Sequence, residues 1–178
     1  PPDLPSMRHV VINSLSQRDL KFFRGLESLV VPNVFDYETP PPEIDDYSRD
    51  FREALGFSPY DWLFLQNTRI VARKGIDISF ELLRRLRDPR ARLIITHPAG
   101  DEGMAYYRQL LHRAQAMNVE VHYLAGFIEQ RRIVRNGRKA YTPWDVYPHA
   151  DLITYPTLCE GFGNALLEAV YFRKPMLV

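Results

Sequence analysis

Short apolar runs alternate with longer amphipathic stretches over the last two thirds of the chain. Four of these runs are rich in aliphatic and aromatic residues, which is the pattern of strands buried on both faces. They cover residues 62–67, 92–96, 119–124 and 152–155. Residues 76–86 and 102–117 have the periodicity of helices, and a last strand is expected over residues 175–178. This alternation predicts a parallel, doubly wound α/β sheet.

The helix predicted over residues 76–86 has one apolar and one basic face. Four apolar side chains are expected to point inward: Ile76, Phe80, Leu83 and Leu86. Three basic side chains are expected to point outward: Arg84, Arg85 and Arg87. A short helix over residues 144–149 is expected just before the strand at 152–155.

The first 60 residues have a different pattern. Residues 7–15 predict a strand and 16–23 a short helix, and residues 29–31 predict a second strand that Pro32 stops. Three consecutive prolines then occur within residues 37–44, so this stretch is expected to be a linker.

A helix is predicted directly after the linker. Asp45 or Asp46 can cap its first turn, and the helix is expected to run through Leu55 and to end at Gly56.

The strand at 152–155 leads into the most informative unit of the chain. It is followed by Glu160, a Gly-Phe-Gly turn and a helix over residues 164–173 that is apolar almost all round. Such a helix is expected to be buried. The glycine turn lets a ligand approach the backbone N–H groups at the start of the helix.

Glu168 lies on this helix, four residues after Asn164 and on the same face. A lone buried carboxylate costs several kcal/mol, so Glu168 is expected either to be paired or to face a polar cleft. One interpretation is a capping Asn164 and a Glu168 held by a nearby arginine. The glycine turn and Glu160 beside it favour a ligand site.

The spacing of the two glutamates resembles the E-x7-E motif of the retaining glycosyltransferase family 4, whose enzymes have the GT-B fold. A second segment, residues 66–77, is similar to that family's strand-end arginine followed five residues later by Lys-Gly, here Arg69 and Lys74-Gly75. A third, residues 31–36, resembles the hinge that enters the family's C-terminal domain. Three motifs in the family's order make the resemblance specific, and it covers nearly the whole chain.

The resemblance implies a Rossmann-like, doubly wound parallel sheet that forms one truncated half of a GT-B glycosyltransferase. Residues 1–36 would be the end of an N-terminal domain and the hinge, and residues 37–60 a linker and helix. Residues 61–178 would be the donor-binding domain, truncated at its C-terminus. The acceptor-binding domain would precede residue 1.

Arg69 and Lys74 follow the strand at 62–67, so they lie at the sheet edge where such folds bind ligands. Read from the sequence alone, they are either diphosphate ligands or a pair of surface cations. The resemblance assigns them to the diphosphate of a nucleotide sugar, where they would stabilise the leaving group. It makes Glu160 a ligand of the donor sugar, and these three are the expected catalytic residues.

The resemblance also implies contacts to the rest of the donor. Glu168 would bind the ribose, and backbone N–H groups would meet the phosphates or the sugar at Gly161, Phe162, Gly163 and Asn164. The base would be framed by Gly126, Phe127 and Ile128. Arg73 matches no ligand of the family and is expected on the surface, and His97 is interpreted as a loop histidine.

The implied activity is hexosyl transfer from a nucleoside diphosphate sugar to an acceptor hydroxyl, with retention of configuration. The acceptor, a sugar, a lipid or a small molecule, would bind through the absent N-terminal domain, so this chain alone should bind nucleotide without turnover. Two alternatives stay open: a GT-B-like nucleotide-sugar epimerase and a non-catalytic nucleotide-sugar-binding module. No cofactor or metal is expected, because the five histidines are scattered.

The composition limits the binding partners and the cellular compartment that can be expected for this protein. The net charge of +1 gives no general reason to expect nucleic acid. Residues 130–139 hold five basic residues and are interpreted as a solvated loop or hairpin, with a phosphorylated or nucleic-acid partner as the alternative. A single cysteine, Cys159, excludes an internal disulfide and fits a reducing compartment. No apolar run reaches membrane-spanning length and the start is no signal peptide. The expected location is the cytoplasm, or the membrane periphery through parts not present.

Overall fold

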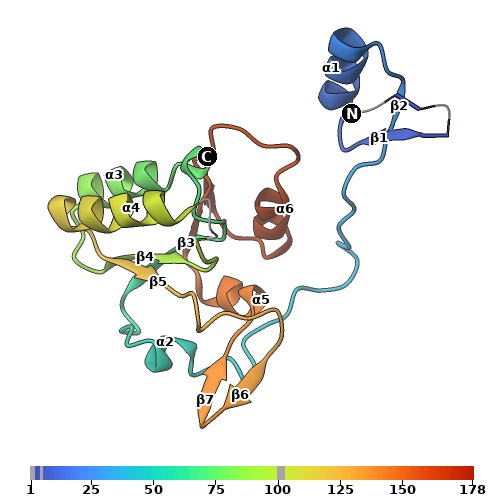
Figure 1. Ribbon diagram of the computed structural model, residues 1–178. Coiled ribbons are helices and arrows are strands. Elements are labelled where there is room, and N and C mark those ends of the chain that lie inside the picture. Colours follow the sequence, from blue (N-terminus) through green and yellow to red (C-terminus); the bar gives the residue numbers. More distant parts are fainter. Residues whose placement is uncertain (1–2, 5, 100–102) are drawn as a thin grey trace.

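Five parallel strands form the central sheet of the computed structural model, which describes residues 3–4, 6–99 and 103–178 (Figure 1). In chain order they are β3 (Trp62–Gln66), β4 (Ala91–Ile95), β5 (Val121–Tyr123), β8 (Leu152–Thr154) and β9 (Met176–Leu177). Their spatial order is β5-β4-β3-β8-β9, and every neighbouring pair is parallel. The chain moves outward on one side of β3 and then crosses to the other side. The order therefore reverses between β3 and β8, where such sheets bind ligands.

Strict alternation of side chains explains why the strands are apolar throughout. In β3, Phe64 packs into the core on one face, whereas Leu63 and Leu65 pack into the core on the other. In β4, Leu93 belongs to the first core and Ile94 to the second. Because both faces are covered, each strand buries consecutive residues. The predicted doubly wound α/β class is confirmed.

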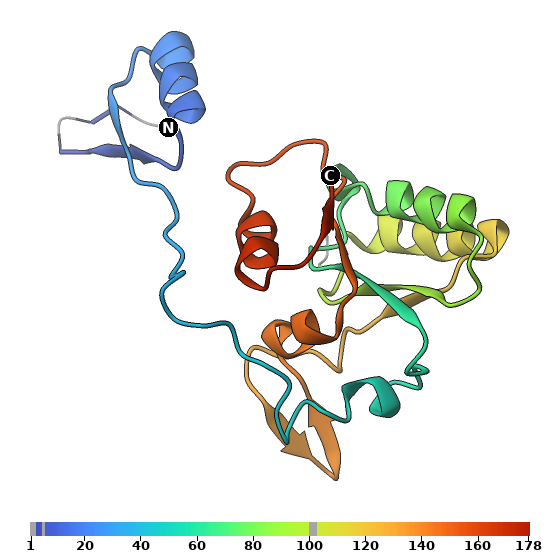
Figure 2. The ribbon, with the colours of Figure 1, turned by 180° about the vertical axis from the view of Figure 1, so that it is seen from behind.

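Helices cover both faces of the sheet (Figures 1 and 2). On one face lie α3 (Ile76–Leu86) and α4 (Met104–Met117). On the other lie α2 (Phe51–Ala54), α5 (Pro143–Val146), the 3-10 turn η3 (Tyr147–His149) and α6 (Asn164–Tyr171). The predicted bounds of α3 agree with the structure, and the first residue of the helix predicted over 102–117 lies outside the described residues.

Two predictions about helix burial are wrong. Leu86 is 47% exposed, because α3 ends there and Arg87 turns the chain with a left-handed φ of 53°. In α6 only Ala169 and Tyr171 are buried, whereas Val170 is 57% exposed. One side of α6 packs on the sheet core and no other described element covers the opposite side, so the helix is not buried all round.

The helix predicted from Asp45 to Leu55 is reduced to the four residues of α2. Asp45 caps a tight turn instead, since its carboxylate accepts hydrogen bonds from the backbone N–H of Tyr47 at 3.0 Å and of Ser48 at 2.9 Å. Gly56 has a φ of 75° and does end the segment as predicted.

The first residues form a separate β-α-β unit. Strands β1 (His9–Val11) and β2 (Ser28–Val30) pair in parallel around α1 (Ser14–Arg24). The predicted strand over 7–15 is too long, because the Asn13 side chain accepts a hydrogen bond from Ser16 N at 2.7 Å and starts the helix at residue 14. An extended segment joins this unit to the main sheet (Figures 1 and 2).

The basic segment 130–139 contains a hairpin of β6 (Ile133–Arg135) and β7 (Arg138–Ala140). Its turn residues Asn136 and Gly137 both have positive φ, which matches the twist of a two-residue hairpin turn. The predicted loop or hairpin is therefore a hairpin.

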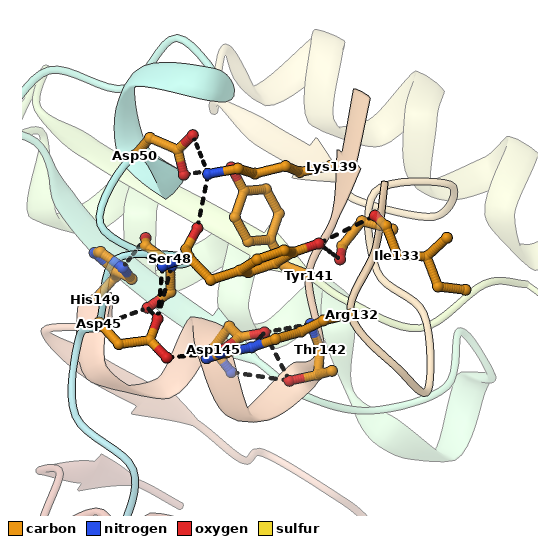
Figure 3. Close-up of polar contacts among 12 residues, drawn as sticks. Asp45, Ser48, Asp50, Arg132, Ile133, Lys139, Tyr141, Thr142, Asp145 and His149 are labelled. Atoms are coloured by element: carbon orange, nitrogen blue, oxygen red, sulfur yellow. Dashed lines mark hydrogen bonds and ion pairs between the residues drawn. The ribbon is translucent and has the colours of Figure 1, made fainter. Parts of the chain in front are cut away.

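Two of its five basic side chains are structural (Figure 3). Arg132 pairs with Asp145 and Asp45, and Lys139 pairs with Asp50 at 2.7 Å. The pairs with Asp45 and Asp50 connect the basic segment to the residues before α2, and the pair with Asp145 connects it to α5. They favour the interpretation of a structural connection over a binding arm.

Candidate functional site

A cavity of about 480 Å³ opens where the strand order reverses, at the carboxyl ends of β3 and β8. It gathers most of the predicted site residues: Arg69, Lys74, Glu160, Gly161, Phe162, Gly163, Asn164 and Glu168. These residues come from two segments about 90 positions apart in the sequence, and the parallel pairing of β3 with β8 brings the segments together.

The β3 side of the cavity is shaped by the 3-10 turn η1 (Ala72–Lys74). Gly75 ends this turn with a left-handed φ of 60°. A Cβ atom at this position would lie 2.1 Å from the carbonyl oxygen of Pro156, so only glycine fits. Gln66 donates a hydrogen bond to the Lys74 carbonyl at 2.8 Å. Together these contacts fix the backbone that carries the Lys74 ammonium.

Three cations line this wall: Arg69, Arg73 and Lys74. Burial lowers the pKa of Lys74, and the charges of Arg73 and Arg69 lower it further. Arg73 is exposed, as the sequence predicts, with 43% of its side chain accessible, and it donates to the Cys159 carbonyl at 3.0 Å. Because it also lines the cavity, it belongs to the candidate site as well. Its position in the same short turn as Lys74 was the signal for it in the sequence.

Glu160 lies among these cations. Its carboxylate pairs with Lys74, accepts a hydrogen bond from Thr157 Oγ1 at 3.3 Å, and lies 3.7 Å from Arg73 Nη1. A carboxylate thus neutralises part of the cationic wall in this structure. A phosphate group that enters the cavity would compete with it for the same donors.

The glycine turn and the start of α6 form the opposite wall. Gly163 has a φ of 95°, and a Cβ there would approach the Tyr155 hydroxyl to 3.1 Å. Among the described residues no side chain caps α6, so the N–H groups of Asn164 and Ala165 are available to an anion, whereas Leu166 N–H donates to the Gly163 carbonyl at 2.9 Å. Gly163 is the N-cap and Asn164 is the first residue of the helix, so the interpretation of Asn164 as a cap is wrong.

Two asparagines of the N-terminal segment also reach this wall. Asn13 donates a hydrogen bond from its side chain to the Gly161 carbonyl, and Asn33 donates to Asn164 Oδ1 at 2.6 Å. The sequence analysis missed both residues, because nothing in their local pattern indicates a partner some 130 to 150 positions away.

Glu168 is held by neutral groups. Its Oε2 atom accepts a hydrogen bond from Asn67 Nδ2 at 2.8 Å and another from the Tyr147 hydroxyl at 2.7 Å. Burial and the charge of Glu168 raise the pKa of Tyr147, so this phenol stays protonated and donates. The interpretation of Glu168 as the partner of an arginine is wrong. The prediction that Glu168 faces a polar cleft is confirmed, since it lines the cavity.

His97 follows β4 and lines the same cavity. Its Nδ1 atom lies 3.0 Å from Thr96 Oγ1, and Thr96 donates to Asn67 Oδ1 at 2.5 Å. Burial lowers the pKa of His97, and the charges of Arg69 and Lys74 lower it further. The imidazole is therefore neutral at neutral pH.

The residues predicted to frame the base do not line this cavity. Gly126 borders a separate cavity of about 180 Å³ beside the β6–β7 hairpin. The Phe127 ring lies under the Arg138 guanidinium at 4.0 Å, and Ile128 pairs with Tyr141. The structure does not bring these three residues to the other site residues, and their contact with a base stays a prediction.

Within the residues that the structure describes, no cluster of three or more His, Cys, Asp or Glu side chains is placed to hold a metal ion. The same part of the chain has no helix that is long and apolar enough to cross a bilayer.

The fold and the cavity define a class of protein: a doubly wound α/β domain with a pocket lined by cationic side chains at its switch point. Residues 48–178 match the family described as "Glycosyl transferases group 1". The chain belongs to this family.

Two curated relatives match nearly all of the chain. The mannosylglucosylglycerate synthase of Petrotoga mobilis is 35% identical to this chain over 96% of the chain's length. The mannosylglucosylglycerate synthase of Thermotoga maritima is 34% identical over 100% of the chain's length. The chain spans 43% of the length of each relative.

Solved structures agree on the fold. Anabaena HepE, crystallised in complex with UDP and glucose, matches with a TM-score of 0.71 at 19% identity, over 94% of this chain and 42% of that one. The glycosyltransferase WaaG matches with a TM-score of 0.67 at 20% identity, over the same shares. These neighbours show that the chain has the architecture of one half of a GT-B glycosyltransferase.

Proposed function

We propose that the protein containing this chain transfers a hexosyl group from a nucleoside diphosphate sugar to an acceptor hydroxyl with retention of configuration, as in glycosyltransferase family 4. The chain supplies the donor site. The observation that carries this proposal is the cavity itself, in which the Arg69, Arg73 and Lys74 cations face the open start of α6. A diphosphate fits between two such walls, because both offer hydrogen-bond donors to anionic oxygen.

The reaction breaks the bond between the anomeric carbon and the diphosphate oxygen and forms a bond from that carbon to the acceptor oxygen. The acceptor proton leaves with the nucleoside diphosphate. Negative charge develops on the departing diphosphate, and Arg69, Lys74 and the α6 N–H groups would stabilise it. Glu160 would bind a hydroxyl of the donor sugar and Glu168 the ribose. No metal takes part in this scheme.

The names of the relatives support a proposal for the donor and the acceptor. Their names support mannose as the transferred sugar and glucosylglycerate as the acceptor. HepE has been crystallised in complex with UDP and glucose and in complex with UDP-glucose, which supports a nucleoside diphosphate as the leaving group. The acceptor would bind to parts of the protein outside this chain, and the protein would work in the cytoplasm or at the membrane periphery.

The test is a transfer assay on the full-length protein with a panel of nucleoside diphosphate hexoses and glucosylglycerate. We expect a new glycosidic bond whose anomeric configuration, read by proton NMR, matches that of the donor. An inverted product would contradict retention. Conversion of the donor to an epimer without transfer would favour the nucleotide-sugar epimerase. A protein that binds donor but gives neither product would favour the non-catalytic binding module.

A further inference from the structure

His97 is the one histidine in the cavity wall, among the residues described, and its protonation pattern can be read from its neighbours. A chain of hydrogen bonds runs from Glu168 through Asn67 and Thr96 to His97. Each step of this chain has only one arrangement of hydrogens that satisfies every group.

The chain starts at a group that can only accept. The Glu168 carboxylate takes a hydrogen bond from Asn67, so the amide nitrogen of Asn67 must face it. The same nitrogen also lies 3.2 Å from the Tyr147 oxygen, which is a second hydrogen-bond acceptor on this side of the amide. A flipped amide would place its oxygen against the carboxylate. The Asn67 oxygen therefore points to Thr96.

Thr96 transmits this orientation. Its hydroxyl is 1% exposed and lies 2.5 Å from the Asn67 oxygen, which can only accept. The single hydroxyl hydrogen is used there, so the Thr96 oxygen can only accept from its other neighbour, His97 Nδ1 at 3.0 Å. The Nδ1 atom must carry the imidazole proton. The Nε2 atom then holds an unshared electron pair.

That electron pair needs a hydrogen-bond donor. No hydrogen bond joins His97 Nε2 to another residue in the described part of the chain. Burial lowers the pKa of His97, and the nearby cations Arg69 and Lys74 lower it further, so the ring stays neutral and Nε2 stays an acceptor. An ionised diphosphate has no hydrogen to donate, whereas the hydroxyl groups of a sugar do.

We propose that His97 binds a hydroxyl group of the sugar-containing donor through Nε2, in a tautomer that Glu168 fixes through Asn67 and Thr96. His97 is a specificity-determining residue, and Thr96 and Asn67 position it. The hydroxyl belongs to the ribose or to the hexose, and both offer the same chemistry. The proposal rests on the donor site of the proposed function.

The first measurement needs no ligand. Imidazole 15N chemical shifts of the full-length protein at pH 7.5 distinguish the two neutral tautomers, and His97 is expected to be protonated at Nδ1. Thr96→Val keeps the shape of the side chain and removes the hydroxyl, so the Nδ1 preference should be lost. A wild-type His97 that is protonated at Nε2 would overturn the proposal, whether or not the protein is a glycosyltransferase.

The second measurement is binding calorimetry on the full-length protein. UDP, GDP and ADP are compared first, and the nucleoside diphosphate that binds best is chosen. Binding is then measured for that nucleotide, for its 2′-deoxy and 3′-deoxy forms, and for its hexose conjugate. His97→Phe should weaken binding of the hexose conjugate about five- to tenfold, the worth of one hydrogen bond. If His97→Phe weakens binding of the unconjugated ribonucleotide equally, and has no effect on binding of one of the deoxy forms, the hydroxyl belongs to the ribose. A loss confined to the hexose conjugate assigns the hexose.

His112→Gln is the matched control, since His112 is an exposed histidine on α4. It should bind like the wild type. Unchanged binding in His97→Phe, or an equal loss for every nucleotide and for inorganic pyrophosphate, would overturn the proposal and leave the transferase assignment intact. A wild-type protein that binds none of the nucleotides would instead defeat the proposed function.

Discussion

Glu160 lies among the cations that would bind the diphosphate in the proposed donor site. Its carboxylate is paired with Lys74 and lies near Arg73, so a diphosphate must compete with it. We predict that Glu160→Gln binds a nucleoside diphosphate more tightly than the wild type, by about three- to tenfold, since a charge pair of this kind contributes about 1 kcal/mol. Transfer by the full-length enzyme should fall, because Glu160 is the proposed sugar ligand.

Calorimetry on both variants measures this effect. Glu53→Gln is the control, because Glu53 is exposed on α2 and its removal changes the net charge equally. Weaker binding in Glu160→Gln than in the wild type would show that the carboxylate supports the diphosphate rather than competing with it.

Buried histidine also makes the stability of the fold depend on pH. His149 is 6% exposed and donates to the Ser48 carbonyl at 2.9 Å (Figure 3), and burial lowers its pKa below the ordinary value of 6.5. The pKa of His97 is lowered as well. Below pH 6.5 the unfolded chain therefore takes up protons that the folded chain does not. The stability of the fold is full above pH 6.5 and is lost as the pH falls below that value.

We predict that the free energy of unfolding, measured by urea denaturation, decreases from pH 7.5 to pH 5. His149→Gln can still donate to Ser48 and cannot titrate, so its decrease should be smaller. The carboxylates titrate at lower pH and contribute little in this window. The same slope in both proteins would show that His149 is not the source.

The residues that the sequence analysis found and missed differ in one respect. Arg69, Lys74, Glu160 and Glu168 were found because their spacing within short segments carries the signal. Asn67 and Thr96 were missed, since their roles depend on hydrogen bonds to side chains 101 and 29 positions away. Contacts of that range are created by the order of the strands, which no local pattern encodes.

At the scale of elements, the turn after β3 is fixed by one close approach. Gly75 has a left-handed φ and its absent Cβ makes room for the Pro156 carbonyl. Gly75→Ala forces η1 away from the end of β8 and moves Lys74 with it. We predict that Gly75→Ala lowers the free energy of unfolding by at least ~2 kcal/mol more than Gly56→Ala does. Gly75→Ala should also lose affinity for a nucleoside diphosphate.

Gly56→Ala is a matched control, because Gly56 also has a left-handed φ, of 75°, and a Cβ there would meet nothing within 4 Å. It isolates the backbone strain, which is about 1–2 kcal/mol. Chemical denaturation and calorimetry on the two variants measure both quantities. Equal destabilisation would show that the Pro156 contact is relieved without cost.

Helices could be predicted where the hydrophobic periodicity extends over several turns. They were predicted wrongly where side-chain hydrogen bonds to distant residues determine the local structure. The bounds of α3 follow from eleven residues of regular pattern. The helix expected from Asp45 failed because Asp45 caps a turn and binds Arg132, a residue 87 positions later. The burial of α6 was overestimated, since an apolar sequence does not show which side of a helix another element covers.

At the scale of the whole molecule, the chain contains a five-stranded main sheet and, in its N-terminal unit, a separate two-stranded sheet. The main sheet has five strands and two covered faces, whereas β1 and β2 form a sheet of two strands and α1 has no buried residue. Large apolar side chains of this N-terminal unit are exposed: Phe22, Phe23, Leu29 and Val31. A two-stranded sheet is marginally stable at best. Asn13 and Asn33 contact the α6 wall and so connect the N-terminal segment to the cavity at the edge of the main sheet.

We predict that these two parts of the 178-residue chain differ in hydrogen exchange. Amides of β1 and β2 should exchange orders of magnitude faster than those of β3 and β4, because opening the small unit exposes little new apolar surface. In the full-length protein, further strands would pair with this unit, and the same amides should become protected. Mass spectrometry of both proteins after matched labelling times measures the difference. Equal protection of β1 and β3 in the 178-residue chain would mean that the N-terminal unit is stable without any further strand. The exposed aromatic side chains of α1 would then need another partner.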